Sequence, residues 1–110
     1  MDIETETKNG ATVIVPKGRI DQSTTSAFQE LLLAKLSDVG AGPVVVDMGN
    51  VEFISSVGLR ALMIGVKSAK AAGGSLVVAA LTPMVKEVFQ ISRFDMVLKC
   101  FDDVESALSS

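Results

Sequence analysis

Histidine, tryptophan and tyrosine are absent from this chain, and cysteine occurs once, at Cys100. Without histidine, neither a Ser-His-Asp triad nor a histidine-ligated metal site can form. A single cysteine allows no internal disulfide and argues against a structural zinc site. The sequence also lacks the GxxxxGKS/T phosphate loop and the GxGxxG dinucleotide fingerprint. We therefore expect a protein that is not an enzyme and that uses no cofactor or metal.

Basic charge and long apolar runs are also missing. The formal net charge is -3, which argues against binding to nucleic acid or to anionic lipid. No apolar run approaches the length of a membrane span, and the acidic start Met1–Glu4 does not resemble a signal peptide. With 110 residues and 48% hydrophobic content, the sequence predicts one folded domain over residues 1–110. These features indicate a soluble cytoplasmic protein.

The N-terminal segment predicts an antiparallel hairpin. Over Ile3–Lys8, the residues Ile3, Thr5 and Thr7 alternate with charged residues, as in a half-exposed strand. Asn9-Gly10 follows, and both residues tolerate the positive φ of a two-residue turn. Thr12–Val15 returns as a second strand, which Pro16 either ends or marks as a sheet edge.

Helices and strands alternate along the remaining chain. Such alternation predicts an α/β fold, in which parallel strands and the hairpin form a four- to five-stranded mixed sheet covered by about four helices. The N-cap cluster Ser23–Thr25 begins the first helix, and Gly40–Pro43 ends it. Its predicted apolar positions are Ala27, Phe28, Leu31, Leu32 and Leu36. Further strands are predicted at Val44–Val46, at Ser75–Ala80 and around Val97 and Leu98, and further helices at Ser56–Ala72, from Thr82-Pro83 and from Asp102.

The most informative stretch lies between Asp47 and Leu59. It leads from an apolar strand into a helix, so it delivers Ser56 to a helix N-terminus. Unpaired N–H groups and the helix dipole favour a negative charge there, so a phosphate on Ser56 would be stabilised. The plainer interpretation of Ser56 is an N-cap serine.

Binding sites in open α/β sheets lie beyond the carboxyl ends of the strands. Asp47 and the loop that carries Ser56 follow such a strand end, and Asp21 is a further candidate for this end of the sheet. We expect Asp47 to be structural, accepting hydrogen bonds from backbone N–H groups of its own loop. Asp21 has two possible roles, namely helix capping or loop hydrogen bonding on one hand and a site role on the other.

These segments resemble the STAS domain, the fold of bacterial anti-sigma factor antagonists. The resemblance rests on Val44–Asp47, which is an apolar strand ending in Asp, and on the Phe53–Leu59 sequence FISSVGL. Gly18–Asp21 is similar to the Gly-x-Leu/Ile-Asp element of the family, and Gly73-Gly74 before an apolar strand also fits. The resemblance covers nearly the whole chain.

The resemblance implies partner switching in transcription regulation. An anti-sigma factor that is itself a serine kinase of the histidine-kinase-like ATPase fold would phosphorylate the motif serine, Ser56. The unphosphorylated antagonist would bind the anti-sigma factor and free the sigma factor, and phosphorylation would release it. A PP2C-type phosphatase would reset the cycle, and ATP would belong to the kinase. Many similar domains have Asp before the acceptor, whereas this chain has Ser55, which is therefore the alternative acceptor.

The predicted partner-binding surface extends along the helix after Ser56. Arg60, Ile64 and Lys67 fall on one strip at helical spacing, with Met63 beside it. Two cations suggest that the strip faces water, so we expect it to contact the partner. Alternatively, Ile64 and Met63 simply join the core.

The predicted partner-binding set is completed by Asp21, Ser55, Ser56, Val57 and Gly58. The resemblance places Asp21 near the serine, where it would position the hydroxyl or contact the partner. Gly58 would allow close approach of a partner, but tight packing of the first helical turn is the favoured interpretation. Cys100 is predicted to be a small buried apolar residue, with a redox role as the lesser alternative.

The leading functional hypothesis is thus a phosphorylation-controlled regulator. The alternative is a STAS scaffold or adaptor, in a larger signalling or transport complex, that needs no phosphorylation. A small hydrolase using Ser56 is disfavoured because no histidine or other evident base is present.

Overall fold

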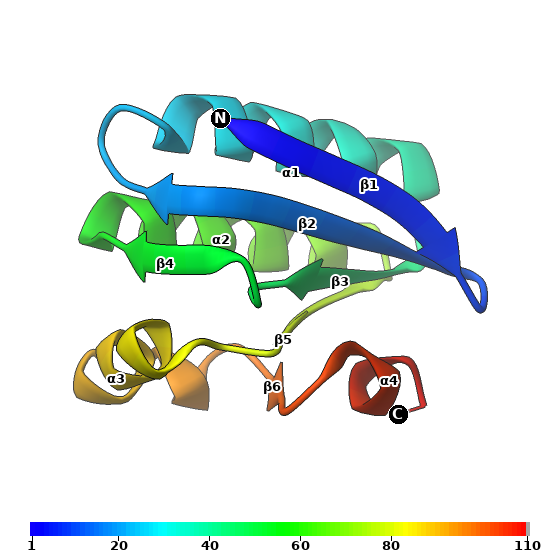
Figure 1. Ribbon diagram of the computed structural model, residues 1–110. Coiled ribbons are helices and arrows are strands. Elements are labelled where there is room, and N and C mark those ends of the chain that lie inside the picture. The colour runs from blue at the N-terminus through cyan, green and yellow to red at the C-terminus, as the bar shows by residue number, and fades with distance from the viewer. Residues whose placement is uncertain (110) are drawn as a thin grey trace.

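The computed structural model describes residues 1–109 and contains one mixed sheet and four α-helices (Figure 1). The strands pair in the order β1-β2-β3-β5-β6, and β4 pairs with β2. This architecture confirms the predicted fold class. The strands are β1 (Asp2–Lys8), β2 (Ala11–Ile20), β3 (Pro43–Asp47), β4 (Val51–Ile54), β5 (Ser75–Ala79) and β6 (Cys100–Phe101). The helices are α1 (Thr25–Val39), α2 (Ser56–Ala71), α3 (Pro83–Ile91) and α4 (Val104–Leu108), with a 3-10 turn η1 at Phe94–Met96.

The predicted hairpin is confirmed. Asn9 and Gly10 have φ values of 51° and 79°, and Lys8 pairs with Ala11 across them. However, the prediction that Pro16 ends the second strand or marks an edge is wrong, because β2 continues to Ile20 inside the sheet. β2 pairs with β3 over residues 12–14 and with β4 over residues 18–20. Pro16 lies between these stretches, so its missing N–H removes no ladder bond on that side.

Strand β4 was not predicted, and it positions the site. It runs parallel to β2, and Gly18 pairs with Val51 and Ile20 with Ile54. Because both strands end at the same level, the residues that follow them, Asp21 and Ser55, become neighbours.

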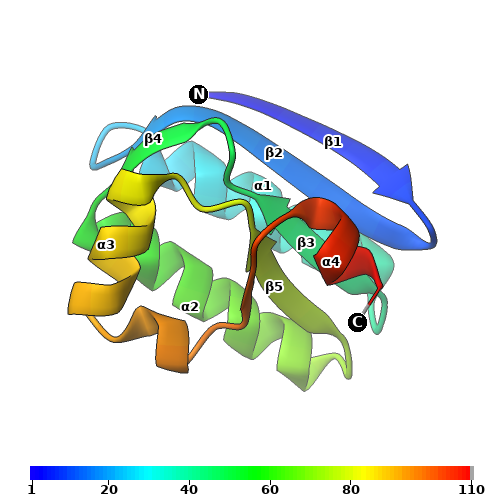
Figure 2. The same ribbon diagram turned by 60° about the horizontal axis from the view of Figure 1, so that its bottom comes forward.

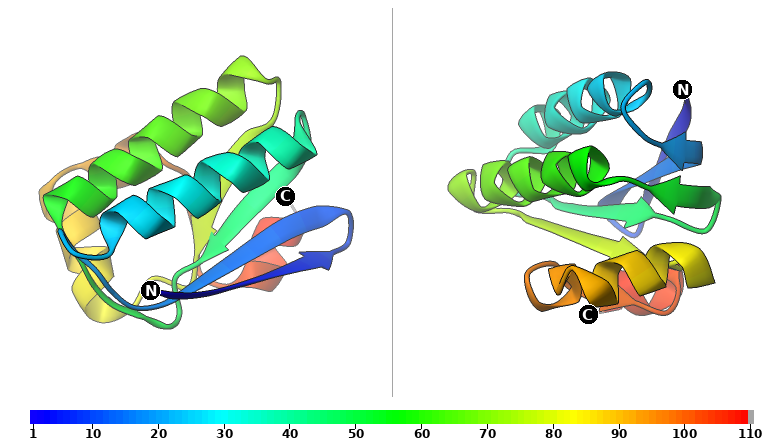
Figure 3. Two further views of the ribbon diagram at one scale, coloured as in Figure 1. Left: turned by 90° about the horizontal axis from the view of Figure 1, so that it is seen from above. Right: turned by 90° about the vertical axis from the view of Figure 1, so that its left-hand side faces the viewer.

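The helices cover both faces of the sheet. Helices α1 and α2 lie side by side on one face (Figure 3), and α4 packs over β3, β5 and β6 on the other (Figure 2). The larger core cluster, between the sheet and α1, α2 and α3, includes Ile14, Phe28, Leu62, Val78 and Phe89.

One predicted core position in α1 is wrong. Ala27 is exposed, whereas Thr25, Phe28, Leu32 and Leu36 form the buried stripe. With 3.6 residues per turn, Ala27 lies about 100° around the helix from Phe28 and so faces away from this stripe.

The last strand also differs from the prediction. Leu98 is buried but follows η1, while Val97 is 48% exposed, and the strand forms only at Cys100–Phe101. Arg93, in the left-handed conformation with φ 57°, separates α3 from η1. The Leu98 N–H then donates to the Phe94 carbonyl, which keeps this segment turned rather than extended.

Gly58 fixes how the first turn of α2 packs against the strands. A Cβ atom at this position would lie 2.7 Å from Ile54 Cγ1, 2.8 Å from Ile20 Cγ2 and 3.2 Å from the Ile20 carbonyl oxygen. Only a residue without a side chain fits without displacing both β2 and β4.

We expect Gly58→Ala to lower the free energy of unfolding by about 1–2 kcal/mol, because the overpacking penalty exceeds the helix propensity that alanine adds. Urea denaturation measures this change. Arg60→Ala, an exposed substitution in the same helix, is the control and should change stability by less than about 0.5 kcal/mol. Equal stability of Gly58→Ala and wild type would contradict the packing argument.

Candidate phosphorylation and partner-binding site

A shallow depression lies beyond the carboxyl ends of β2 and β4. The two strand ends are joined there, because the Ser55 N–H donates to the Ile20 carbonyl at 2.9 Å. The depression has a volume of about 450 Å³, and we call it the serine depression. Its lining residues are Asp21, Gln22, Ser23, Ser55, Ser56 and Val57.

Ser55, and not Ser56, caps α2. Ser55 keeps the extended conformation of the strand, with φ −91° and ψ 174°, and its Oγ accepts a hydrogen bond from the Gly58 N–H at 3.4 Å. The N-cap role considered for Ser56 is therefore wrong. The reason is that Ile54 is the last residue of β4, so Ser55 is the residue at which extended backbone changes to helix.

Ser56 is the first residue of α2 and is exposed to solvent. Within residues 1–109 its hydroxyl has no hydrogen-bond partner, so it is available to a modifying enzyme. The first turn of α2 contains no acidic residue to offset the positive end of the helix dipole, and Arg60 follows one turn later. A negative charge on Ser56 would therefore be stabilised by the helix N-terminus and by a nearby cation.

Asp21 organises the opposite wall of the depression. Its Oδ1 accepts hydrogen bonds from the Ser23 hydroxyl at 2.7 Å and from the Ser23 N–H at 3.0 Å. The hydroxyl bond is the largest cause, and the backbone bond the second, of a lowered pKa for the Asp21 carboxyl relative to its ordinary value of 3.8. Loop hydrogen bonding, one of the two expected roles, is thus present, and the carboxylate also lines the depression.

The backbone before α1 is held by Arg19 and Thr24. The Arg19 guanidinium stacks 4.6 Å from the ring centre of Phe53 in β4, and its Nε lies 3.7 Å from Asp21 Oδ2. Thr24 Oγ1 donates to the Arg19 carbonyl at 2.7 Å and accepts from the Asp21 N–H at 2.9 Å. Asp21 is therefore held in place from both sides before any partner binds.

Asp47 has the structural role that we expected. Its Oδ1 accepts a hydrogen bond from the Gly49 N–H at 2.9 Å, within the turn that leads from β3 to β4. Asp47 does not line the serine depression.

The α2 strip, formed by Arg60, Ile64 and Lys67, is exposed as predicted, but the neighbouring Met63 is only partly exposed. Arg60, Ile64 and Lys67 face solvent, and Ile64 is 36% exposed. Met63 is half-buried and packs against the core, so it offers only part of its side chain to a partner. Gly58 is buried, which favours its packing role over direct contact with a partner.

Two lining residues were missed in the sequence. Gln22 and Ser23 extend the serine depression, but the sequence pattern around Ser23 indicated only helix capping. Thr24 is the residue at the N-cap position of α1, and its side chain makes no capping bond in the described part of the chain. The missing signal was the pairing of β2 with β4, which brings Asp21–Ser23 beside the serines.

Residues 1–109 offer neither a metal site nor a membrane span. That part of the chain holds no group of three or more Cys, Asp or Glu side chains placed to bind a metal ion. No helix in it is long and apolar enough to cross a membrane.

The geometry is that of a small α/β domain with an exposed serine at a helix N-terminus, and comparison with known proteins identifies the family. The STAS domain family matches residues 2–107, so this chain belongs to the STAS domain family. The Bordetella bronchiseptica protein BtrV, named as an anti-sigma factor antagonist, is 30% identical over 102 residues, which cover 93% of this chain and 87% of BtrV.

Solved structures share the fold. An anti-sigma factor antagonist from Mycobacterium paratuberculosis has a TM-score of 0.88 at 25% identity, covering 98% of this chain and 91% of that one. The Bacillus cell fate determinant SpoIIAA, solved in its phosphorylated form, has a TM-score of 0.71 at 16% identity, covering 98% and 97% of the two chains. BtrV and the Mycobacterium paratuberculosis protein are thus both named as anti-sigma factor antagonists.

The lowered pKa of Asp21 gives a direct test of the loop. In wild type, the carboxyl resonance of Asp21 should titrate below pH 3.8, and in Ser23→Ala its midpoint should move toward 3.8, because the largest stabilising bond to the carboxylate is lost. Carbon-detected NMR titration measures both midpoints.

The lowered pKa of Asp21 also makes the stability of the fold depend on pH. A pKa that is lower in the folded chain than in the unfolded chain contributes stability above the unfolded value, and that stability is lost as the pH falls through the folded value. A wild-type midpoint at or above 3.8 would show that the Asp21–Ser23 bonds do not form in solution.

Proposed function

We propose that this protein is an anti-sigma factor antagonist that acts by partner switching in the cytoplasm, with Ser56 as the phosphorylated residue. The observation that carries the proposal is the exposed and unbonded Ser56 hydroxyl at the N-terminus of a 16-residue helix. Ser55, the alternative acceptor, is half-buried and its Oγ is occupied as the N-cap. The similarity to BtrV supports the family role, and SpoIIAA is a protein of the same fold that has been solved phosphorylated.

The partner in this proposal is an anti-sigma factor with serine kinase activity and the histidine-kinase-like ATPase fold. ATP binds to that kinase, and a PP2C-type phosphatase removes the phosphate. The surface that contacts the kinase comprises Asp21, Ser55, Ser56, Val57 and the exposed residues of the α2 strip. In this surface, Arg60 and Lys67 supply positive charge and Ile64 supplies apolar contact area.

Phosphorylation breaks this interface by a local charge change. A phosphoserine carries about −1.5 to −2 charges at neutral pH. The helix N-terminus and Arg60 stabilise that charge within the free domain, so the fold persists. A bound partner would instead have to pack against a doubly charged group beside the Asp21 carboxylate, and both repulsion and desolvation oppose this.

The acceptor is tested by phosphorylation in lysate of the native host with added ATP, followed by site mapping with mass spectrometry. We expect phosphate on Ser56 in wild type and in Ser55→Ala, and none in Ser56→Ala. Loss of the Ser55 cap costs about 1 kcal/mol, so circular dichroism should show that Ser55→Ala is still folded. Phosphate on Ser55 alone would overturn the assignment.

A pull-down from the same lysate, with wild type and Ser56→Asp as baits, tests the switch. Wild type should capture a histidine-kinase-like ATPase, and Ser56→Asp should not. The matched control is Ser106→Asp, which places the same charge on an exposed serine in the first turn of α4, on the other face of the sheet. Equal capture by wild type and Ser56→Asp would favour the alternative, a scaffold that needs no phosphorylation.

The α2 strip gives a separate prediction. Substituting Arg60→Ala and Ile64→Ala together should weaken partner binding at least about tenfold, because a charged and an apolar contact are both lost. The melting temperature should change by less than about 4 °C, since both side chains are exposed. Calorimetric titration and thermal denaturation measure the two effects.

The control for the strip is Glu6→Ala with Lys8→Ala, which removes an exposed ion pair at the distant hairpin. This variant should bind like wild type. A large loss of stability in the α2 double variant would show that the strip belongs to the core.

A further inference from the structure

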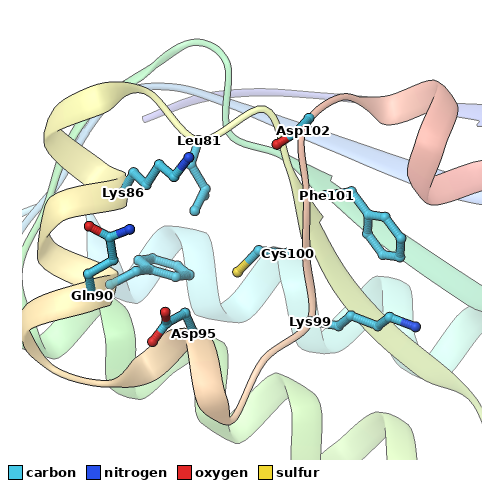
Figure 4. A pocket seen from close by; sticks show the side chains of 9 residues that line it. Leu81, Lys86, Gln90, Asp95, Lys99, Cys100, Phe101 and Asp102 are labelled. Carbon is cyan, nitrogen blue, oxygen red and sulfur yellow. The ribbon is translucent and has the colours of Figure 1, made fainter.

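A second cavity lies between α3 and the edge strand β6 (Figure 4). It has a volume of about 410 Å³ and shares no lining residue with the serine depression. We call it the β6 groove. Its lining residues are Leu81, Lys86, Phe89, Gln90, Asp95, Lys99, Cys100, Phe101 and Asp102.

One wall of the β6 groove is formed by strand β6, which also has an unpaired side. Strand β6 is the last strand of the sheet and pairs only with β5. The Val78 N–H donates to the Lys99 carbonyl, and the Ala80 N–H donates to the Phe101 carbonyl, each at 3.0 Å. In a parallel ladder, successive residues point their backbone groups to opposite sides, so the N–H and the carbonyl of Cys100 point away from β5.

These two Cys100 groups have no hydrogen-bond partner within residues 1–109. A neighbouring donor and acceptor on one residue of an edge strand are the groups that bind an added strand. Cys100 also lines the β6 groove, so a segment added at this edge would also contact the side chains of the groove.

The side chains around the groove suit a peptide. Figure 4 shows Cys100 pointing toward α3, while Lys99 and Phe101 point the other way. Phe89 is fully buried and supplies an apolar base, and Gln90 adds an amide. Lys86 on α3 and Asp95 on η1 carry opposite charges at separate points of the lining.

The Cys100 thiol forms part of the wall of the groove. Burial, and then the nearby Asp95 carboxylate, raise the pKa of this thiol above its ordinary value of 9.0. Its Sγ lies 3.2 Å from the Leu98 carbonyl, to which the thiol donates. A neutral, hydrogen-bonded thiol is a poor nucleophile, which argues against a redox role and leaves the backbone as the binding element.

We propose that the β6 groove binds a short extended peptide segment of a partner protein, which adds to the free side of β6 by hydrogen bonds to the Cys100 N–H and carbonyl. A segment of about three residues, roughly 10 Å long, spans one such pair of bonds with a residue on either side. Opposite charges on the peptide would pair with Lys86 and Asp95. This site is independent of Ser56.

The test uses two capped tripeptides, acetyl-Lys-Val-Glu-amide and acetyl-Glu-Val-Lys-amide, titrated into the full chain and followed by amide NMR. The two peptides carry their charged residues in opposite order. One of them can therefore pair with Lys86 and Asp95 whichever way the added strand runs. We expect at least one peptide to shift the resonances of groove residues and to slow hydrogen exchange at the Cys100 amide about fivefold or more. The same peptide, N-methylated at the residue that donates to the Cys100 carbonyl, should bind up to about tenfold more weakly. That residue is the valine in antiparallel addition and the residue after it in parallel addition.

A variant pair tests the location. Lys86→Glu should weaken binding of the better peptide severalfold, while Lys70→Glu, the same charge change on exposed α2, should leave it unchanged. Unchanged Cys100 exchange with both peptides would overturn the proposal. So would equal protection by free valine, because the groove would then be a small-molecule pocket.

Discussion

The parallel pairing of β2 with β4, at Ile20 and Ile54, is the constraint on which the site depends. It ends two strands at one level, so Asp21 and Ser55 emerge side by side. It also forms the wall against which the first turn of α2 packs, and Gly58 permits that approach because a Cβ there would overlap both isoleucines. The position of Ser56 therefore follows from backbone pairing and close packing, and not from side-chain contacts of its own.

This construction separates the groups that stabilise the fold from the proposed signalling surface. The groups that hold the loops, namely Arg19, Thr24, Asp47 and Ser55, are engaged in hydrogen bonds or ring stacking. Ser56 and the exposed α2 strip are not needed for any of those contacts. A charge added at Ser56 can thus alter a binding surface while the scaffold under it stays unchanged, which is the physical requirement for a switch without refolding.

Local chemistry made much of this structure predictable. Asn9-Gly10 specified the hairpin, the valine run specified β3, and the serine motif placed a helix N-terminus correctly at Ser56. Strand β4 was missed because it has four residues, of which Glu52 is exposed and Phe53 half-buried, and its existence depends on the distant β2. The cap at Ser55 was missed for the same reason, since the end of an unpredicted strand determines it. Tertiary pairing decided these features, and no local pattern encodes it.

The β6 groove is another feature that the sequence alone did not predict. Cys100 looked like a small core residue, but its thiol is only half-buried, and the informative part of the residue is its backbone.

The groove and the serine depression both lie near the carboxyl ends of parallel strands, because these strands run in the same direction. Screening restricts charge effects to about 8 Å at physiological ionic strength, so a phosphate on Ser56 acts mainly on its own depression. Helix α3 packs on both β4 and η1, and the sheet joins β2 to β6 through β3 and β5, so these elements connect the two sites.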